Sequence, residues 1–307
     1  MINGIININK EKGFTSHDVV AKLRGIVGQR KIGHTGTLDP DATGVLPVCL
    51  GKGTKLCDML TDKNKTYETV LLLGLETDTQ DVTGEILAEG AAEAIERLDE
   101  KQVEACIMSF VGKYDQVPPM YSALKVNGKK LYELAREGKV IERKARPVEI
   151  LSIEITKVDL PEVTMTVSCS KGTYIRTLCH DIGQKLEVGG CMKELKRTKV
   201  SRFEIADSLT LGEVQALKDA GKLMECIQPV DSVFQQLEAF YLPEQMEWLA
   251  FNGNPLNVEN QMQRTGWEAN QQIRVYDSNK RFIGIYLYKS HNETLKLEKM
   301  FLDKESN

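Results

Sequence analysis

The sequence lacks any long hydrophobic run, since no apolar stretch approaches the ~20 residues that a membrane-spanning helix requires. It also has no basic segment followed by an apolar run near residue 1, so we expect neither a signal peptide nor a membrane anchor. The seven cysteines are odd in number and include no C-x-x-C pair, which favours reduced thiols over disulfides. These features together predict a cytoplasmic protein.

Cofactor signatures are missing as well. The sequence contains neither a G-x-G-x-x-G fingerprint nor a P-loop, and its four histidines show no metal-ligand spacing. We therefore expect no nucleotide cofactor and no metal. With 41% hydrophobic and 27% charged residues, the composition is that of a globular protein able to bury a core. The length of 307 residues fits one large and one small domain.

Positive charge is scarce overall but unevenly distributed. The net charge of −4 argues against a nucleic-acid partner. Residues 203–307 are acidic, with 10 basic and 16 acidic side chains, whereas residues 113–146 carry nine basic and four acidic ones. A charged segment is usually only a solvated face, so this pattern alone does not establish RNA binding.

Residues 33–47, GHTGTLDPDATGVLP, are the most informative segment. Their Gly, Pro, Thr and Asp content favours a loop, and the apolar residues 45–50 that follow predict a buried strand. Asp39 therefore lies on a tight loop that a core strand holds in place. By itself, an Asp before a Pro is ordinary turn chemistry, in which the carboxylate bonds its own backbone.

This loop resembles the catalytic loop of the TruB-type tRNA pseudouridine synthases, G-H-T-G-x-L-D-P-x-A-T-G-x-L-P, at every fixed position. Further segments are similar to the same family in the expected order, at residues 4–16, 65–84, 116–138, 169–183 and 195–203. The resemblance covers roughly the first 235 residues. It implies an enzyme that isomerises uridine 55 in the T loop of tRNA to pseudouridine, with tRNA as partner and no guide RNA.

The resemblance assigns three catalytic residues, Asp39, Tyr67 and Arg176. Asp39 would attack C1′ of the ribose or deprotonate a glycal-type intermediate, and the sequence leaves both routes open. Tyr67 would stack on a flipped uracil, although a Tyr in a strand-like segment more often packs in a core. Arg176 would pair with Asp39 and offset its desolvation. The alternative for Arg176 is a surface residue in the first turn of a helix, where the dipole gives a cation no gain.

Other positions match residues that the family places near its RNA. The pocket residues implied by the resemblance are Lys10, His34, Tyr174 and Leu195. Lys10 is followed by Glu11 where the family usually has Pro, so the loop after Lys10 departs from the family pattern. The basic segment 113–146 resembles an arm that closes over the RNA. We expect phosphate contacts from Lys129, Lys130, Arg143 and Lys144.

Strand-like and helix-like segments are mixed along the chain. Strands are predicted at residues 4–9, 67–75, 148–156, 163–170, 272–276, 282–287 and 295–300. Helices are predicted at residues 15–27, 102–110, 173–186 and 212–220. The pattern predicts an α+β fold with a large mixed, mainly antiparallel sheet and flanking helices. We expect a catalytic domain over residues 1–235, a small β-rich domain that resembles a PUA domain over residues 236–307, and a monomer.

Three other functions compete with the isomerase. A non-catalytic RNA chaperone would keep the basic arm but has no need of Asp39, Tyr67 and Arg176 together. A glycosidase usually shows two catalytic carboxylates and releases a free base. A guide-RNA-dependent relative would share the loop but carry extra segments for protein partners.

Overall fold

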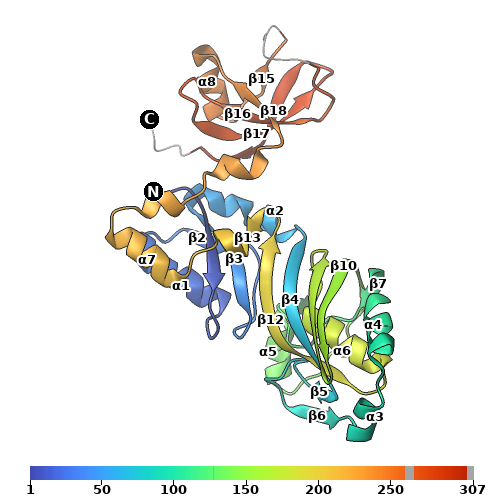
Figure 1. Cartoon of the computed structure of the whole chain (residues 1–307). Coiled ribbons are helices and arrows are strands. Elements are labelled where there is room, and N and C mark those ends of the chain that lie inside the picture. The colour runs from blue at the N-terminus through green and yellow to red at the C-terminus, as the bar shows by residue number, and fades with distance from the viewer. Residues whose placement is uncertain (127, 260–265, 303–307) are drawn as a thin grey trace.

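A large sheet dominates the structure, a computed structural model that describes residues 1–126, 128–259 and 266–302 (Figure 1). Its order is β1-β3-β12-β4-β11-β10-β7, with β2 beside β3 and β13 beside β12. These strands are β1 (Gly4–Lys10), β2 (Ile32–His34), β3 (Thr43–Leu50), β4 (Lys65–Leu73), β7 (Gly112–Gln116), β10 (Arg146–Asp159), β11 (Glu162–Cys169), β12 (Gly190–Val200) and β13 (Phe203–Glu204). All pairs are antiparallel except β12 with β3, which is parallel. The predicted α+β fold with a mixed, mainly antiparallel sheet is confirmed.

Helices flank this sheet. The longer ones are α1 (Ser16–Val27), α4 (Glu100–Met108), α6 (Ile175–Lys185) and α7 (Leu211–Asp219); the short ones are α2 (Cys57–Thr61), α3 (Ala92–Glu96), α5 (Leu131–Arg136) and the 3-10 turns η1 (Gly51–Leu56), η2 (Ile205–Asp207), η3 (Leu223–Cys226) and η4 (Val230–Phe234). Thr15 caps α1 in a capping box with Asp18, and Gly28 ends the helix at φ 75°. Helix α6 buries Ile175, Leu178 and Ile182 against the sheet. Its first turn is thereby fixed next to the strands.

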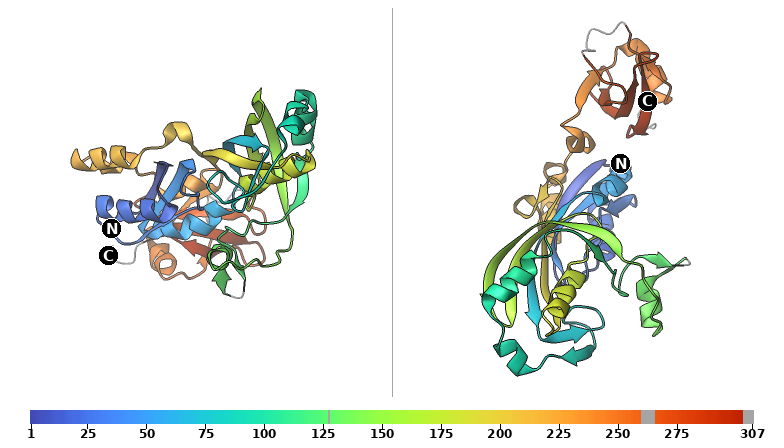
Figure 2. Two further views of the ribbon diagram at one scale, coloured as in Figure 1. Left: turned by 90° about the horizontal axis from the view of Figure 1, so that it is seen from below. Right: turned by 90° about the vertical axis from the view of Figure 1, so that its right-hand side faces the viewer.

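A second, smaller sheet lies at the other end of the molecule (Figures 1 and 2). Its order is β14-β16-β17-β18-β15, and it comprises β14 (Glu238–Tyr241), β15 (Leu256–Asn257), β16 (Gln272–Tyr276), β17 (Phe282–Lys289) and β18 (Thr294–Met300), with helix α8 (Glu244–Phe251) beside it. This region has a core of its own, around Phe240, Trp267 and Tyr286. A separate apolar cluster, which includes Phe234 and Phe301, joins it to the large sheet.

Two small hairpins lie beside the large sheet. One pairs β5 (Leu75–Thr77) with β6 (Ile86–Glu89), and the other pairs β8 (Lys125–Val126) with β9 (Lys129–Lys130) ahead of α5. The second hairpin and α5 form an arm, residues 117–126 and 128–145, which stands away from the sheet in the right-hand view of Figure 2. The arm has a small apolar core of Met120, Leu131 and Leu134. This core gives the basic segment a defined shape.

Two differences from the sequence predictions concern strands that form the site. The strand predicted at 67–75 starts earlier, at Lys65, and ends at Leu73, because Gly74 adopts φ 87° and breaks the extended chain. Strand β12 was not predicted, since its charged residues hide any alternation of polar and apolar positions. It nevertheless lies in the middle of the sheet, between β3 and β4. In the described part of the chain, no helix has the length and apolar character needed to cross a membrane.

Candidate active site

The loop that carries Asp39 connects β2 to β3, and hydrogen bonds from the start of α1 and from the segment before it hold the loop in place. Ser16, at the start of α1, bonds both backbone groups of Leu38: its Oγ accepts from Leu38 N at 2.9 Å and donates to Leu38 O at 3.3 Å. Gly13 N donates to Pro40 O at 2.9 Å. The loop turns at Gly36, where φ is 134°. Asp39 is therefore held on a rigid support, with 39% of its side chain exposed.

Arg176, in the first turn of α6, faces this carboxylate. Its Nε lies 3.1 Å from Oδ2 of Asp39, and its Nη2 lies 3.4 Å from Oδ1. The same guanidinium donates to Thr79 O and to Tyr121 O, both at 2.8 Å. Only 7% of the Arg176 side chain is exposed. The cation is therefore locked in place, and the helix-surface alternative for Arg176 is wrong.

A second carboxylate, Asp81, lies on the far side of Arg176. Its Oδ2 is 3.7 Å from Nη1 of Arg176, while its Oδ1 accepts from the hydroxyls of Thr79 at 2.8 Å and Thr83 at 2.5 Å. Asp81 was not among the site residues predicted from the sequence. The only signal was its place in the run TDTQDVTG, whose Thr and Asp side chains favour hydrogen-bonded turns. Asp81 thus helps to orient the guanidinium.

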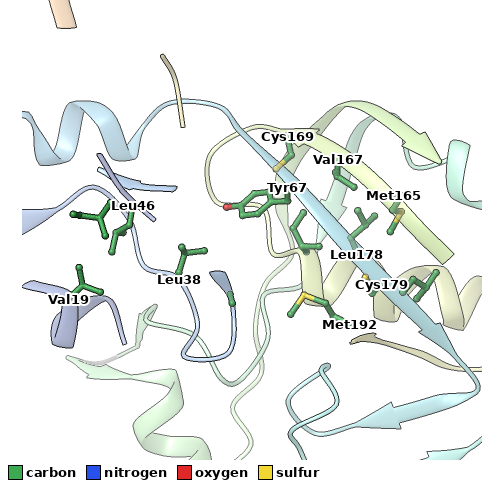
Figure 3. Close-up of a cluster of buried hydrophobic side chains, with 14 of the residues drawn as sticks. Val19, Leu38, Leu46, Tyr67, Met165, Val167, Cys169, Leu178, Cys179 and Met192 are labelled. Carbon is green, nitrogen blue, oxygen red and sulfur yellow. The ribbon is translucent and has the colours of Figure 1, made fainter. Parts of the chain in front are cut away.

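Tyr67 lies on β4 within the core of the large sheet, with 7% of its surface exposed. Figure 3 shows its ring beside Cys169, with the hydroxyl pointing to the side on which Leu38 and Leu46 lie. Burial raises the pKa of the phenol, and the nearby Arg197 guanidinium acts in the opposite direction. Tyr67 is accordingly a neutral phenol at neutral pH. Its hydroxyl is turned toward the Asp39 loop.

These residues line one cleft of about 1180 Å³. Asp39, Tyr67 and Arg176 lie on its wall, together with Tyr174 and Leu195. Both backbone groups of Tyr174 are bonded to the side chain of Gln116, at 2.8 and 3.0 Å. The arm contributes Lys130 and Arg136 to the same cleft. The structure thus brings three predicted catalytic residues, two predicted pocket residues and part of the basic arm into one space.

Two family profiles match most of the chain. One, described as the N-terminal domain of TruB family pseudouridylate synthase, matches residues 24–175, and one described as the tRNA pseudouridylate synthase B C-terminal domain matches residues 176–235. A Lachnoclostridium phytofermentans protein named tRNA pseudouridine synthase B is 51% identical over 98% of this chain and 100% of its own length. The chain belongs to the TruB family of pseudouridylate synthases.

Other comparisons agree with membership of the TruB family. A Clostridium novyi protein, also named tRNA pseudouridine synthase B, is 43% identical over 98% of this chain and 100% of its own length. In a crystal structure of a Cbf5-Nop10-Gar1 complex, one chain matches with a TM-score of 0.72 and 25% identity, over 98% of this chain and 86% of that one. An H/ACA RNP bound to a substrate RNA containing 2′-deoxyuridine matches with a TM-score of 0.71 and 23% identity, over the same shares, and supports the fold alone.

Lys10 does not reach the cleft, contrary to its predicted contact with the substrate. No part of it is exposed, and its ammonium donates to the carbonyls of Phe14 at 2.6 Å, Pro40 at 3.0 Å and Glu11 at 3.1 Å. Burial lowers the pKa of Lys10 to about 8, and the charges of Asp39 and Asp41 act in the opposite direction. This burial contradicts direct contact with RNA. Lys10 instead supports the Asp39 loop from beneath, in spite of the Glu that replaces the usual Pro.

His34 lies at the start of the same loop and is half-buried. Its ring packs edge-on against His17 with 5.3 Å between centroids, and its Nδ1 accepts from Gly36 N at 3.2 Å. Burial, helped by the charges of His17 and Arg197, lowers the pKa of His34 to about 4. His34 is therefore a neutral imidazole that shapes the loop. Its predicted contact with RNA stays a prediction.

The predicted phosphate contacts fall into two groups. Lys144 is exposed, Lys129 is exposed and lies 3.6 Å from Glu137, and Lys130 lines the cleft with its ammonium 5.2 Å from the Tyr132 ring centre. Arg143 differs, because it is half-buried and donates from Nη1 to Pro118 O at 3.2 Å. The three lysines are accessible to a polyanion, whereas Arg143 anchors the base of the arm.

All seven cysteines are free thiols.

Proposed function

We propose that this chain isomerises uridine 55 in the T loop of tRNA to pseudouridine, acting alone and through Asp39. The observation that carries the proposal is the carboxylate of Asp39, which Arg176 holds on one side and which faces the cleft on the other. Relatives that match the chain over nearly its whole length are named tRNA pseudouridine synthase B. The tRNA substrate fits those names, and the remaining steps follow from the chemistry of the site.

The reaction breaks the N1–C1′ bond of uridine and joins C5 to C1′. A proton leaves C5 and N1 gains one, so the base is neither oxidised nor reduced and water is not consumed. Asp39 supplies an oxygen nucleophile for C1′ or a base for a glycal intermediate, and either role needs an ionised carboxylate. The guanidinium of Arg176 stabilises that charge in a site that RNA would close to water.

The uracil must leave the RNA stack before Asp39 can reach C1′. Tyr67 offers a flat ring at the wall of the cleft, with a neutral hydroxyl on the side of the Asp39 loop. We infer that the flipped base stacks on this ring, while Leu195 and Tyr174 close the sides of the pocket. We infer that the phenol relays a proton during the exchange at C5.

We propose that the arm binds the RNA phosphates around the target uridine. Its exposed Lys129 and Lys144 and the cleft-lining Lys130 provide the charge. We propose that the folded T loop is recognised mainly by its shape. Its paired and stacked bases hide their edges from the protein, and only unstacked bases expose them. We further propose a catalytic domain over residues 1–235 and a small PUA-like domain over 236–307, a division that the separate core around Phe240 and Trp267 supports.

Two alternatives are less well supported by the site. A glycosidase uses two carboxylates that flank the bond it cleaves, and Asp81, the carboxylate that shares Arg176 with Asp39, is bonded by Thr79 and Thr83 and directed at Arg176. A guide-RNA-dependent enzyme is suggested by the titles of the matching Cbf5 complexes, but the relatives at 43–51% identity carry the tRNA synthase name over their full length. We therefore propose a stand-alone cytoplasmic monomer that acts on tRNA.

The test is to incubate the purified chain, without other macromolecules, with an unmodified tRNA transcript. Pseudouridine is mapped by carbodiimide labelling and primer extension. We expect one modified site, at position 55, and no free uracil. Release of uracil would indicate a glycosidase, and binding without modification would indicate a chaperone. Activity that appears only with added guide RNA would also contradict the proposal.

A further inference from the structure

Arg197 is the largest side chain that the fold buries almost completely, with 1% of its surface exposed. It lies on β12, where it pairs with Tyr67 of β4 on one side and with Gly44 of β3 on the other. In an antiparallel pair such as Arg197 with Tyr67, the two side chains point to the same face and their Cβ atoms are about 5 Å apart. Arg197 therefore lies between the strand that carries Tyr67 and the strand into which the Asp39 loop runs.

The guanidinium reaches both ends of that loop. Its Nε donates to Val45 O at 2.7 Å, and its Nη2 donates to Gly36 O at 3.2 Å. Gly36 precedes Asp39 in the chain and Val45 follows it, so the two carbonyls lie at the two ends of the loop. Because the guanidinium is a rigid planar group, its two bonds fix the separation of the loop ends.

Gly44 shows how closely β12 approaches the loop. A Cβ on this residue would lie 2.2 Å from the backbone oxygen of Arg197, and its φ is 103°. Any other residue would push the two strands apart. The glycine at this position of the loop motif thus permits the contact between β12 and β3 that brings Arg197 under the loop.

The phenol of Tyr67 also lies near Arg197, because the two residues are opposite each other in the sheet, and the guanidinium charge acts to lower the pKa of that phenol. A guanidinium has only donors, so it leaves the hydrogen of the Tyr67 hydroxyl to point to a different acceptor. Since the ring borders the cleft, that acceptor can be a bound base or ribose.

Burying this cation has a cost that its partners only partly offset. Its hydrogen bonds to Gly36 and Val45 both go to neutral carbonyl oxygens. Removing a charge from water is costly, and an apolar side chain would often be at least as stable in its place. Stability alone is therefore a weak explanation for an Arg here.

We propose that Arg197 is a positioning residue for the reaction: it holds the Asp39 loop in a fixed arrangement beside Tyr67. This inference rests on the roles proposed above for Asp39 and Tyr67. Arg197 borders the cleft, but only 1% of its surface is exposed, so we infer that it acts through those two residues and not by contact with the substrate.

The first test compares Arg197→Lys with Arg274→Lys. Arg274 is a matched control, because it is a half-buried arginine that also donates to a backbone carbonyl, Leu237 O at 2.9 Å, but lies in the smaller sheet. Lysine keeps the charge at residue 197 but lacks the rigid planar fork that holds two carbonyls at a fixed separation. We expect the single-turnover rate of Arg197→Lys to fall roughly 100-fold, the effect of a displacement near 1 Å. Its Kd for tRNA should stay within about threefold of wild type, because phosphate contacts dominate affinity.

The control Arg274→Lys should keep the wild-type rate. A near-wild-type rate in Arg197→Lys, or a loss that appears only as weaker tRNA binding, would overturn the inference. If the wild-type chain makes no pseudouridine, the proposed function fails, and this is a different result from an active wild type with an equally active Arg197→Lys.

A second variant covers the case in which Arg197→Lys does not fold. Arg197→Ala is refolded and assayed with guanidinium ion at a sub-denaturing concentration, which refills the vacated space. We expect a saturable recovery of the single-turnover rate, absent when Arg274→Ala is treated in the same way. Arg197→Ala that regains its circular dichroism spectrum in guanidinium but stays inactive would contradict a positioning role.

Discussion

The guanidinium of Arg176 meets the carboxylate of Asp39 with two nitrogens, Nε at 3.1 Å from Oδ2 and Nη2 at 3.4 Å from Oδ1. The exposed fractions of the two side chains differ, 7% for Arg176 and 39% for Asp39. One side of the carboxylate is thus fixed by protein while the other faces the cleft. Two-nitrogen contacts of this kind set orientation as well as charge. The pair presents an oriented carboxylate to a ligand bound in the cleft.

Replacing Lys10 should destabilise the loop that carries Asp39. Lys10→Met removes the ammonium and leaves three buried carbonyls without their donor, so we expect the free energy of unfolding to fall by about 3 kcal/mol or more. The single-turnover rate should fall as well, since Pro40 next to Asp39 loses its support. Urea unfolding and single-turnover assays measure both effects. Lys31→Met, at an exposed position, is the control. Equal stability of the two variants would contradict the supporting role of Lys10.

The stability of the fold should respond to pH through His34. Its pKa in the folded protein is lowered to about 4, below the ordinary value of about 6.5 expected in the unfolded chain. As pH falls from about 6.5 towards 4, the His34 side chain binds a proton in the unfolded state but not in the folded state, so the free energy of unfolding decreases. His34→Gln should make this decrease shallower between pH 7 and 5, as measured by urea unfolding. His291→Gln, at an exposed position, should not. The same decrease in both variants would show that His34 titrates normally.

Neutralising the arm should weaken binding more than chemistry. We compare wild type with the triple variant Lys129→Gln, Lys130→Gln, Lys144→Gln, leaving Arg143 in place because it anchors the arm. For each lysine that binds a phosphate, its replacement should reduce the slope of log K against log salt by about 0.7–0.9. The single-turnover rate at saturating enzyme should remain close to wild type.

A control for the arm is the pair Lys218→Gln and Lys222→Gln, two exposed lysines on and just after α7. This variant should keep the wild-type salt slope. If the triple variant also kept it, or showed only a small part of the wild-type saturated rate, the arm would not be the phosphate-binding element.

Activity should survive chelation of metal ions. Within the described residues, no cluster of three or more His, Cys, Asp or Glu side chains is arranged to hold a metal. The assay uses a short pre-folded T-arm stem-loop, because a full tRNA itself needs Mg²⁺ to fold. An unchanged single-turnover rate after EDTA treatment is expected. Loss of activity on this minimal substrate, restored by an added metal, would contradict the prediction.

The sequence predicted the residues of the site better than their surroundings. Asp39, Tyr67 and Arg176 stand in motifs with fixed spacing, and the structure places all three on one cleft wall. Turn-forming residues, the Thr15 cap and apolar periodicity located most helices and strands, because these signals act over a few neighbouring residues.

Contacts between distant segments were beyond such local signals. Lys10 looked like a pocket residue, and only the packing of three carbonyls around it shows that it lies beneath the loop. Strand β12 has no clear alternation, so the place of Arg197 opposite Tyr67 became visible only in the sheet register. Asp81 stands 95 residues before Arg176 in the chain, and no sequence pattern pairs them.

The most direct test of the proposed mechanism is the single-turnover rate of Asp39→Asn on unmodified tRNA. The matched control is Asp41→Asn, an exposed aspartate two residues further along the same loop. The amide keeps the shape of Asp39 but can neither attack C1′ nor act as a base. We expect Asp39→Asn to form no pseudouridine while binding tRNA within a few-fold of wild type, because phosphate contacts dominate the affinity, and Asp41→Asn to react at the wild-type rate. An Asp39→Asn variant that kept even roughly a tenth of the wild-type rate, a barrier change of only about 1.4 kcal/mol, would show that Asp39 is not the essential group.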